Sequence, residues 1–150
     1  MYNSKIERIS EILCLLLHIM GGESFSKTKL VKLLYLLDVV KSRKGVPKFS
    51  GITFKSYYYG PYSDEIEESI SLLSSLGYVT IKKDIGFSGN SYYQIQLNRL
   101  ADFGHLTDRE KIEIKEIVSP LINRSLNELL NITYSTKEFK KTSFGEAISL

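Results

Sequence analysis

Residues 30–40 read Leu-Val-Lys-Leu-Leu-Tyr-Leu-Leu-Asp-Val-Val, and only Lys32 and Asp38 in this stretch carry charge. A helix that is apolar on nearly every side is usually buried in the middle of a fold. Basic residues follow the stretch, where they oppose the helix dipole, and Gly45 comes directly after them. The stretch therefore predicts a central helix from about Lys27 to Lys44.

Patterns on both sides of this helix predict the other elements. Apolar residues at three- and four-residue steps indicate a helix from about Ser4 to Met20, which Gly21-Gly22 ends. An alternating, aromatic-rich pattern indicates a strand over Gly51–Tyr59, broken by Gly60-Pro61. The remaining predicted elements are a helix over Ser63–Leu76, a hairpin of strands Tyr78–Lys83 and Ser91–Leu97, a helix from Thr107 to about Val118, and a fifth helix restarting at Ser119-Pro120.

This order predicts an α+β fold that is mainly helical, with about five helices and a small antiparallel sheet. The sheet is expected to include both Ile52–Tyr58 and the hairpin. Three helices followed by a hairpin is a winged-helix-like order, but about nineteen residues, including a strand, separate the second and third helices. The tight turn of a DNA-reading helix-turn-helix is therefore missing. A chain of 150 residues fits one domain, residues 1–150.

Composition excludes several classes of protein. Hydrophobic residues make up 43% and charged residues 25%, which excludes disordered and fibrous chains. The longest apolar stretches, Ile12–Met20 and Leu30–Val40, fall short of the roughly 18 residues that a membrane span needs. One cysteine, two histidines and no glycine-rich phosphate loop predict neither a metal nor a cofactor. The N-terminus lacks the pattern of a secretory signal, so a cytoplasmic location is expected.

Few residues are candidates for catalysis. Cys14 and His18 lie four apart on the first helix, so a thiolate–imidazole pair is one interpretation, but both are expected to be core residues of an apolar helix. Asp38 could be a desolvated base with a raised pKa. Pairing with a nearby Lys or Arg, or exposure on a narrow polar stripe, is the favoured alternative. The sequence thus predicts a protein that is not an enzyme and has no catalytic residues.

The cluster Tyr57-Tyr58-Tyr59-Gly60-Pro61-Tyr62 is the most unusual composition in the chain. Strand alternation would place Tyr58 on the side of Ile52 and Phe54 and leave Tyr57 and Tyr59 on the other. Exposed tyrosines are common anchors of binding sites, although they also occur as ordinary sheet residues. The helix that follows has four acids and no base. The resulting candidate partner-binding residues are Tyr57, Tyr59, Tyr62, Asp64, Glu67 and Glu68.

Nucleic-acid binding is the alternative interpretation. Residues 1–60 hold ten basic and four acidic residues, and the predicted hairpin adds two lysines. The helix over Ser63–Leu76, which would enter the major groove in a winged helix, would be repelled by phosphate. Specific DNA recognition is therefore the second choice. Its candidate residues are Lys27, Lys29, Lys82 and Lys83.

Several short motifs, in a fixed order, resemble the Panacea domain of SocA-like antitoxins. They are Lys32-Leu33-Leu34-Tyr35, Tyr59-Gly60-Pro61 and Leu76-Gly77-Tyr78, followed by Ile132-Thr133-Tyr134-Ser135 and Lys140-Lys141-Thr142. The resemblance covers most of residues 25–145. The chain departs from the family pattern in having no tryptophan before the Gly-Pro turn, in having Tyr62 where Val is common, and in its longer hairpin.

The resemblance implies a non-catalytic protein that neutralises a toxin by binding it or presents a client to a protease. The expected function is that of an antitoxin-like component of a toxin–antitoxin system, with a protein toxin encoded nearby as its partner. A winged-helix transcriptional regulator is the alternative. The sequence leaves open whether the chain forms a homodimer, and no membrane partner is expected.

Overall fold

The computed structural model describes residues 3–24, 26–58, 60–85 and 91–150. These residues form six helices and five strands, and the mainly helical α+β fold is confirmed. The elements are α1 (Ser4–Ile19), β1 (Glu23–Ser24), α2 (Lys27–Arg43), β2 (Lys55–Tyr57), β3 (Gly60–Tyr62), α3 (Asp64–Ser75), β4 (Val79–Ile85), β5 (Ser91–Leu97), α4 (Asp108–Val118), α5 (Leu126–Ser135) and α6 (Lys137–Lys140).

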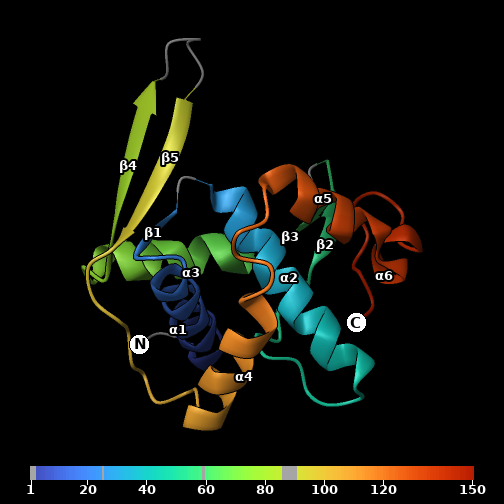
Figure 1. Ribbon diagram of the computed structural model, residues 1–150, viewed down its shortest axis with the longest axis horizontal. Helices are drawn as coiled ribbons and strands as arrows, with labels where there is room; N and C mark the ends of the chain where they lie inside the picture. The colour runs from blue at the N-terminus through green and yellow to red at the C-terminus, as the bar shows by residue number, and fades with distance from the viewer. Residues whose placement is uncertain (1–2, 25, 59, 86–90) are drawn as a thin grey trace.

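Helix α2 crosses the centre of the molecule (Figure 1). Helices α1, α3 and α4 lie on one side of it, and β2, β3, α5 and α6 lie on the other. Every residue from Leu30 to Val39 is buried, as the apolar stretch predicts. The helix begins after Ser26, whose side chain accepts a hydrogen bond from the Lys29 backbone N–H at 3.0 Å.

The strands form two sheets, so the expectation of one sheet is wrong. One sheet has the order β1-β5-β4, and its β4–β5 hairpin projects from the helical body (Figure 1). The other contains only β2 and β3. The two-residue strand β1, which the sequence analysis missed, pairs Glu23 with Gln96 and Ser24 with Ile95. Two residues are too few to show the alternation of apolar and polar side chains that marks a strand. Only the pairing with β5 in the folded chain identifies β1 as one.

Gly60 and Pro61 lie inside β3 rather than ending a strand, which corrects the sequence analysis. Pro61 stands opposite Ser56 in the antiparallel pair. The backbone of Ser56 bonds to the C-terminal segment instead. Its N–H donates to the Glu146 carbonyl at 3.0 Å, and its carbonyl accepts from the Gly145 N–H at 2.6 Å. Ser56 and Pro61 therefore form a non-hydrogen-bonded pair, and the lack of an N–H on proline removes no hydrogen bond between β2 and β3.

The C-terminal segment lies along the free edge of β2. The Ile148 N–H donates to the Phe54 carbonyl at 2.8 Å, and Ala147 forms a bridge with Lys55. Ile148 is buried in the core. The segment therefore covers an edge that would otherwise expose unpaired backbone groups.

The fifth helix starts at Leu126 and not at Ser119-Pro120, where the chain forms turns instead. Ser125 and Glu128 form a capping box, in which the Ser125 side chain accepts from the Glu128 N–H and the Glu128 carboxylate accepts from the Ser125 N–H. The Ser-x-x-Glu spacing was visible in the sequence and marks the true start better than the proline does.

Asp38 is fully buried on α2, so the expectation of exposure on a polar stripe is wrong. Its hydrogen bonds go to Ser50, so the expected pairing with a Lys or Arg is not its main contact either. One carboxylate oxygen accepts from the Ser50 N–H at 3.0 Å, and the other accepts from the Ser50 hydroxyl. Burial raises the pKa of Asp38, while the Ser50 hydrogen bonds and the charge of Lys48 act in the opposite direction. Its role is to tie the loop after α2 to the helix.

We expect Asp38→Ala to lower the free energy of unfolding by about 2–3 kcal/mol, because the buried Ser50 N–H would lose its acceptor. Asp38→Asn keeps one acceptor oxygen, so its loss should be smaller. Urea unfolding measures the free energy of unfolding of the three chains, which should decrease from the parent to Asp38→Asn and then to Asp38→Ala. Equal stability of Asp38→Ala and the parent would contradict this role.

Candidate partner-binding site

The end of β2, the turn after it and the C-terminal segment together form an aromatic surface that consists of Tyr57, Tyr58 and Phe144. Tyr58 is 85% exposed, Phe144 58% and Tyr57 37%. The Phe144 ring centroid lies 4.6 Å from that of Tyr58 and 6.2 Å from that of Tyr57. Exposed rings that gather in this way are typical of interaction sites.

The exposure of Tyr58 contradicts its expected position on the same side as Ile52 and Phe54. Both of those residues are buried, but β2 ends at Tyr57 and Tyr58 belongs to the turn. Strand alternation therefore does not reach it. Phe144 was not among the predicted residues, because it is brought here by the pairing of the C-terminal segment with β2.

A pocket of about 330 Å³ opens beside the aromatic surface, between the start of α2 and the β2–β3 pair. We call it the α2–β3 pocket. Most of its surface is apolar. Its lining residues are Lys27, Thr28, Val31, Lys32, Tyr57, Tyr58, Gly60 and Tyr62.

Lys32 contributes a buried ammonium group to the α2–β3 pocket. The residue is 2% exposed, and its Nζ donates to the Pro61 carbonyl oxygen at 3.1 Å. None of the ion pairs found in the described part of the chain includes Lys32. Burial lowers the pKa of Lys32 to about 8.

Gly60 has no side chain, and this provides the space that the end of the Lys32 side chain occupies. Its φ is +96°, and a Cβ at this position would lie 3.2 Å from Lys32 Nζ and 3.1 Å from a ring carbon of Tyr134. Glycine is therefore needed here for both its backbone conformation and its lack of a side chain.

The acids of α3 are less available than the sequence suggests. Glu67 forms an ion pair with Lys27 and accepts a hydrogen bond from the Tyr62 hydroxyl. Burial alone would raise the pKa of Glu67, but the contacts with Lys27 and Tyr62 outweigh it and the pKa is lowered. Asp64 and Glu68 are exposed.

Glu65, the fourth acid of α3, lies 2.7 Å from Lys5 Nζ in an ion pair. The structure therefore brings Tyr57 and Tyr62 together, with ring centroids 6.3 Å apart, beside a helix whose charge is partly compensated. Tyr59, also among the predicted residues, lies outside the described residues.

The sequence model of the SocA-like antitoxin family, Panacea domain, matches residues 30–140. This chain belongs to that family. No curated protein and no solved structure shows a significant match. The Panacea match includes Lys32, Gly60 and the whole of α3, but it ends before Phe144.

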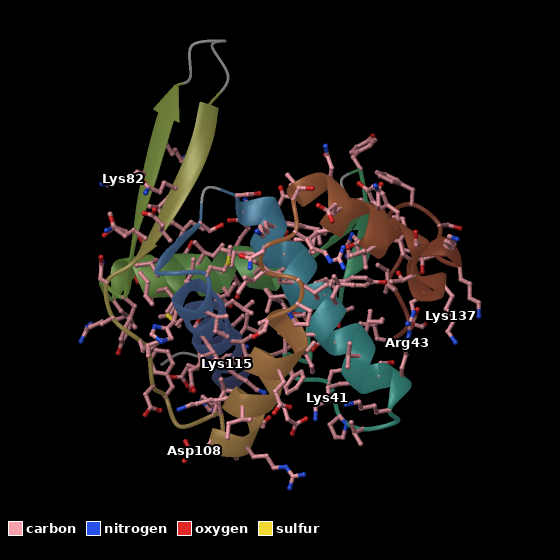
Figure 2. The ribbon with its side chains drawn as sticks, in the orientation of Figure 1. Lys41, Arg43, Lys82, Asp108, Lys115 and Lys137 are labelled. Carbon is pink, nitrogen blue, oxygen red and sulfur yellow. The ribbon has the colours of Figure 1, made fainter. Side chains whose placement is uncertain are left out.

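The lysines of the nucleic-acid alternative do not share one free basic face in this Panacea-family chain. Lys27 is paired with Glu67, and Lys29 Nζ donates to the Ile122 carbonyl at 2.6 Å. Lys82 and Lys83 are exposed on β4. Figure 2 shows Lys82 on the projecting hairpin, on the opposite side of the view from Arg43 and Lys137.

Cys14 and His18 do not form a pair. Cys14 is fully buried, as expected, and burial raises the pKa of its thiol, with a backbone hydrogen bond from Ala101 acting against this. His18 is exposed, so the expectation of a core histidine is wrong. His18 lies on the solvent-facing side of α1, whereas its neighbours Leu17 and Ile19 are buried or pack in part against the core.

The described residues contain no group of three or more His, Cys, Asp or Glu side chains placed to hold a metal ion. Within the same ranges, no helix combines the length and the apolar character needed to cross a membrane.

We expect Gly60→Ala to lower the free energy of unfolding by more than Gly45→Ala does. Both glycines have positive φ, so each substitution should cost about 1–2 kcal/mol in backbone strain. A Cβ at Gly45 meets open space, whereas one at Gly60 meets Lys32 and Tyr134. Thermal unfolding of the two variants checks this, and equal losses would exclude crowding at Gly60.

We also expect the stability of the parent chain to rise between about pH 8 and pH 10.5 relative to that of Lys32→Met. In this range the unfolded chain still holds the Lys32 proton and the folded chain has released it, so the free energy of unfolding increases with pH. Urea unfolding across this range measures the difference. A difference that does not change with pH would contradict the lowered pKa.

Proposed function

We propose that this chain neutralises a protein toxin by binding it directly, through a surface that joins Tyr57, Tyr58, Tyr62 and Phe144 to the first turns of α3. Membership in the antitoxin family suggests an antitoxin-like, non-enzymatic role and, in general terms, a toxin partner. The observation that carries the binding surface is the exposure of Tyr58 and Phe144 at 85% and 58%. Exposure of two packed rings to water is unfavourable, and a partner that covered them would gain free energy from burying this apolar surface.

The composition of this surface supports the proposal. It combines exposed aromatic rings with the exposed carboxylates of Asp64 and Glu68 on the next element. Central aromatic residues usually supply most of the binding energy, while charges at the rim guide association. The ion pair of Lys27 with Glu67 leaves Asp64 and Glu68 as the acids best placed to attract a basic toxin.

The partner is expected to be encoded next to this chain and to act in the cytoplasm. The proposal is tested by co-expressing the neighbouring gene product with this chain and measuring both growth rescue and co-purification. A duplex DNA of the upstream region serves as a control ligand. Tight, sequence-specific binding to that DNA without capture of a neighbouring protein would favour a transcriptional regulator and contradict the proposal.

Alanine variants locate the surface. Tyr58→Ala should weaken toxin binding by about 2 kcal/mol, or about 30-fold in Kd, as loss of a central aromatic residue does. Tyr57→Ala, Tyr62→Ala, Glu67→Ala and Glu68→Ala extend the test to the predicted residues, of which at least one or two should show a similar loss. The measurement is titration calorimetry on folded variants.

Ile112→Ala is the matched control, because Ile112 is 59% exposed on α4, away from the β2–β3 pair. It should bind the toxin as the parent does. Parent-like binding by all five variants of the surface would place the interface elsewhere.

A further inference from the structure

The α2–β3 pocket has an uneven distribution of charge. Lys27 at its edge is neutralised by Glu67, whereas Lys32 donates to a backbone carbonyl and takes part in none of the described ion pairs. An ammonium group as buried as that of Lys32 is normally paired, because removing it from water is costly. A carbonyl dipole compensates this charge only in part.

We propose that the α2–β3 pocket receives a carboxylate of the protein partner, carried next to an aromatic or aliphatic side chain, with the Lys32 ammonium group as its counter-ion. This inference rests on the proposed function, since it requires a protein partner.

The chemistry of the pocket defines this ligand. An ammonium group has three N–H donors, and Pro61 accepts one of them. A carboxylate is an acceptor with full negative charge, so its hydrogen bond to Lys32 is charge-assisted and stronger than the one to a neutral carbonyl. The mostly apolar lining, with Val31 and the rings of Tyr57 and Tyr62, suits an apolar group beside that carboxylate.

The size of the pocket suits a short segment of the partner, with one carboxylate and one neighbouring apolar group. Its volume of about 330 Å³ lies at the lower end of the range for small-molecule sites, roughly 300–1,000 Å³. The carboxylate of Glu67 faces the same region from α3, but Lys27 and the Tyr62 hydroxyl engage it. It therefore does not serve as a counter-ion for Lys32, which takes part in none of the ion pairs among the described residues.

The surroundings favour a protein over a free small molecule. The apolar surface continues beyond the pocket to Phe144, which is 58% exposed and does not line the pocket. A ligand that only filled the pocket would leave this ring in water. A protein that inserted one acidic segment could cover both, as interfaces with a pocket-filling anchor do.

The first arm of the test needs no toxin. N-acetylphenylalanine and N-acetylphenylalaninamide are titrated into the ¹⁵N-labelled full chain at neutral pH, since they differ only in the carboxylate. The acid should give saturable shifts of the backbone amides of residues 27–32, 57, 58, 60 and 62, and it should bind about tenfold more tightly than the amide. Equal binding of the two, shifts confined to other regions, or no saturation up to about 10 mM would overturn the proposal.

Variants assign the preference to one lysine. Lys32→Met keeps an unbranched apolar stem and should abolish the tenfold preference, whereas Lys44→Met, an exposed lysine at the end of the same helix, should keep it. A preference that persists in folded Lys32→Met would overturn the assignment. The comparison of the two probes in the parent chain stands even if Lys32→Met does not fold.

The second arm uses the toxin identified by co-purification. Toxin should displace N-acetylphenylalanine from the parent, and Lys32→Met should bind the toxin at least about tenfold more weakly. Equal toxin binding by both chains would overturn the pocket proposal and leave the proposed function intact. Carboxylate-selective probe binding in a chain that captures no toxin would overturn the proposed function and indicate a site for free carboxylates instead.

Discussion

Burial of α2 is the constraint on which the rest of the structure depends. Two charged side chains, Lys32 and Asp38, are buried with it, and neither could remain so without hydrogen-bond partners. The carboxylate of Asp38 accepts from Ser50, in the loop that follows α2, and the ammonium group of Lys32 donates to Pro61 in β3. The polar groups of one helix thereby determine where the next two segments of the chain lie.

The candidate site is a consequence of this arrangement. Once β3 is held over α2, the turn before it carries Tyr58 into solvent, and Ser56 offers its backbone to the C-terminal segment. That segment then brings Phe144 within 4.6 Å of Tyr58, measured between ring centroids. Tyr58 and Phe144, 86 positions apart in the sequence, thus belong to one aromatic surface, next to a pocket that contains an incompletely compensated charge.

Prediction from the sequence succeeded where the signal was local and regular. The long helices, with Ser26 and the Thr107-Glu110 capping box at their starts, lie within one or two residues of the expected positions. It failed where the outcome depended on contacts made elsewhere. Tyr58 lies in the turn after β2 rather than in a strand, and His18 lies on the solvent-facing side of α1. Tyr57 and Tyr62 were found from composition alone, whereas Phe144 could not be, since nothing near it in the chain distinguishes it.

The sequence by itself determined the mainly helical α+β class, the central position of α2 and the family, because these depend on apolar periodicity, caps and short motifs that neighbouring residues contain. Only the tertiary structure decided that the strands form two sheets, that Asp38 bonds to Ser50, and that Lys32 lines a pocket while taking part in none of the ion pairs among the described residues. The physical reason is that a buried polar group accepts whatever partner the folded chain brings within hydrogen-bond distance, and no local pattern specifies that partner.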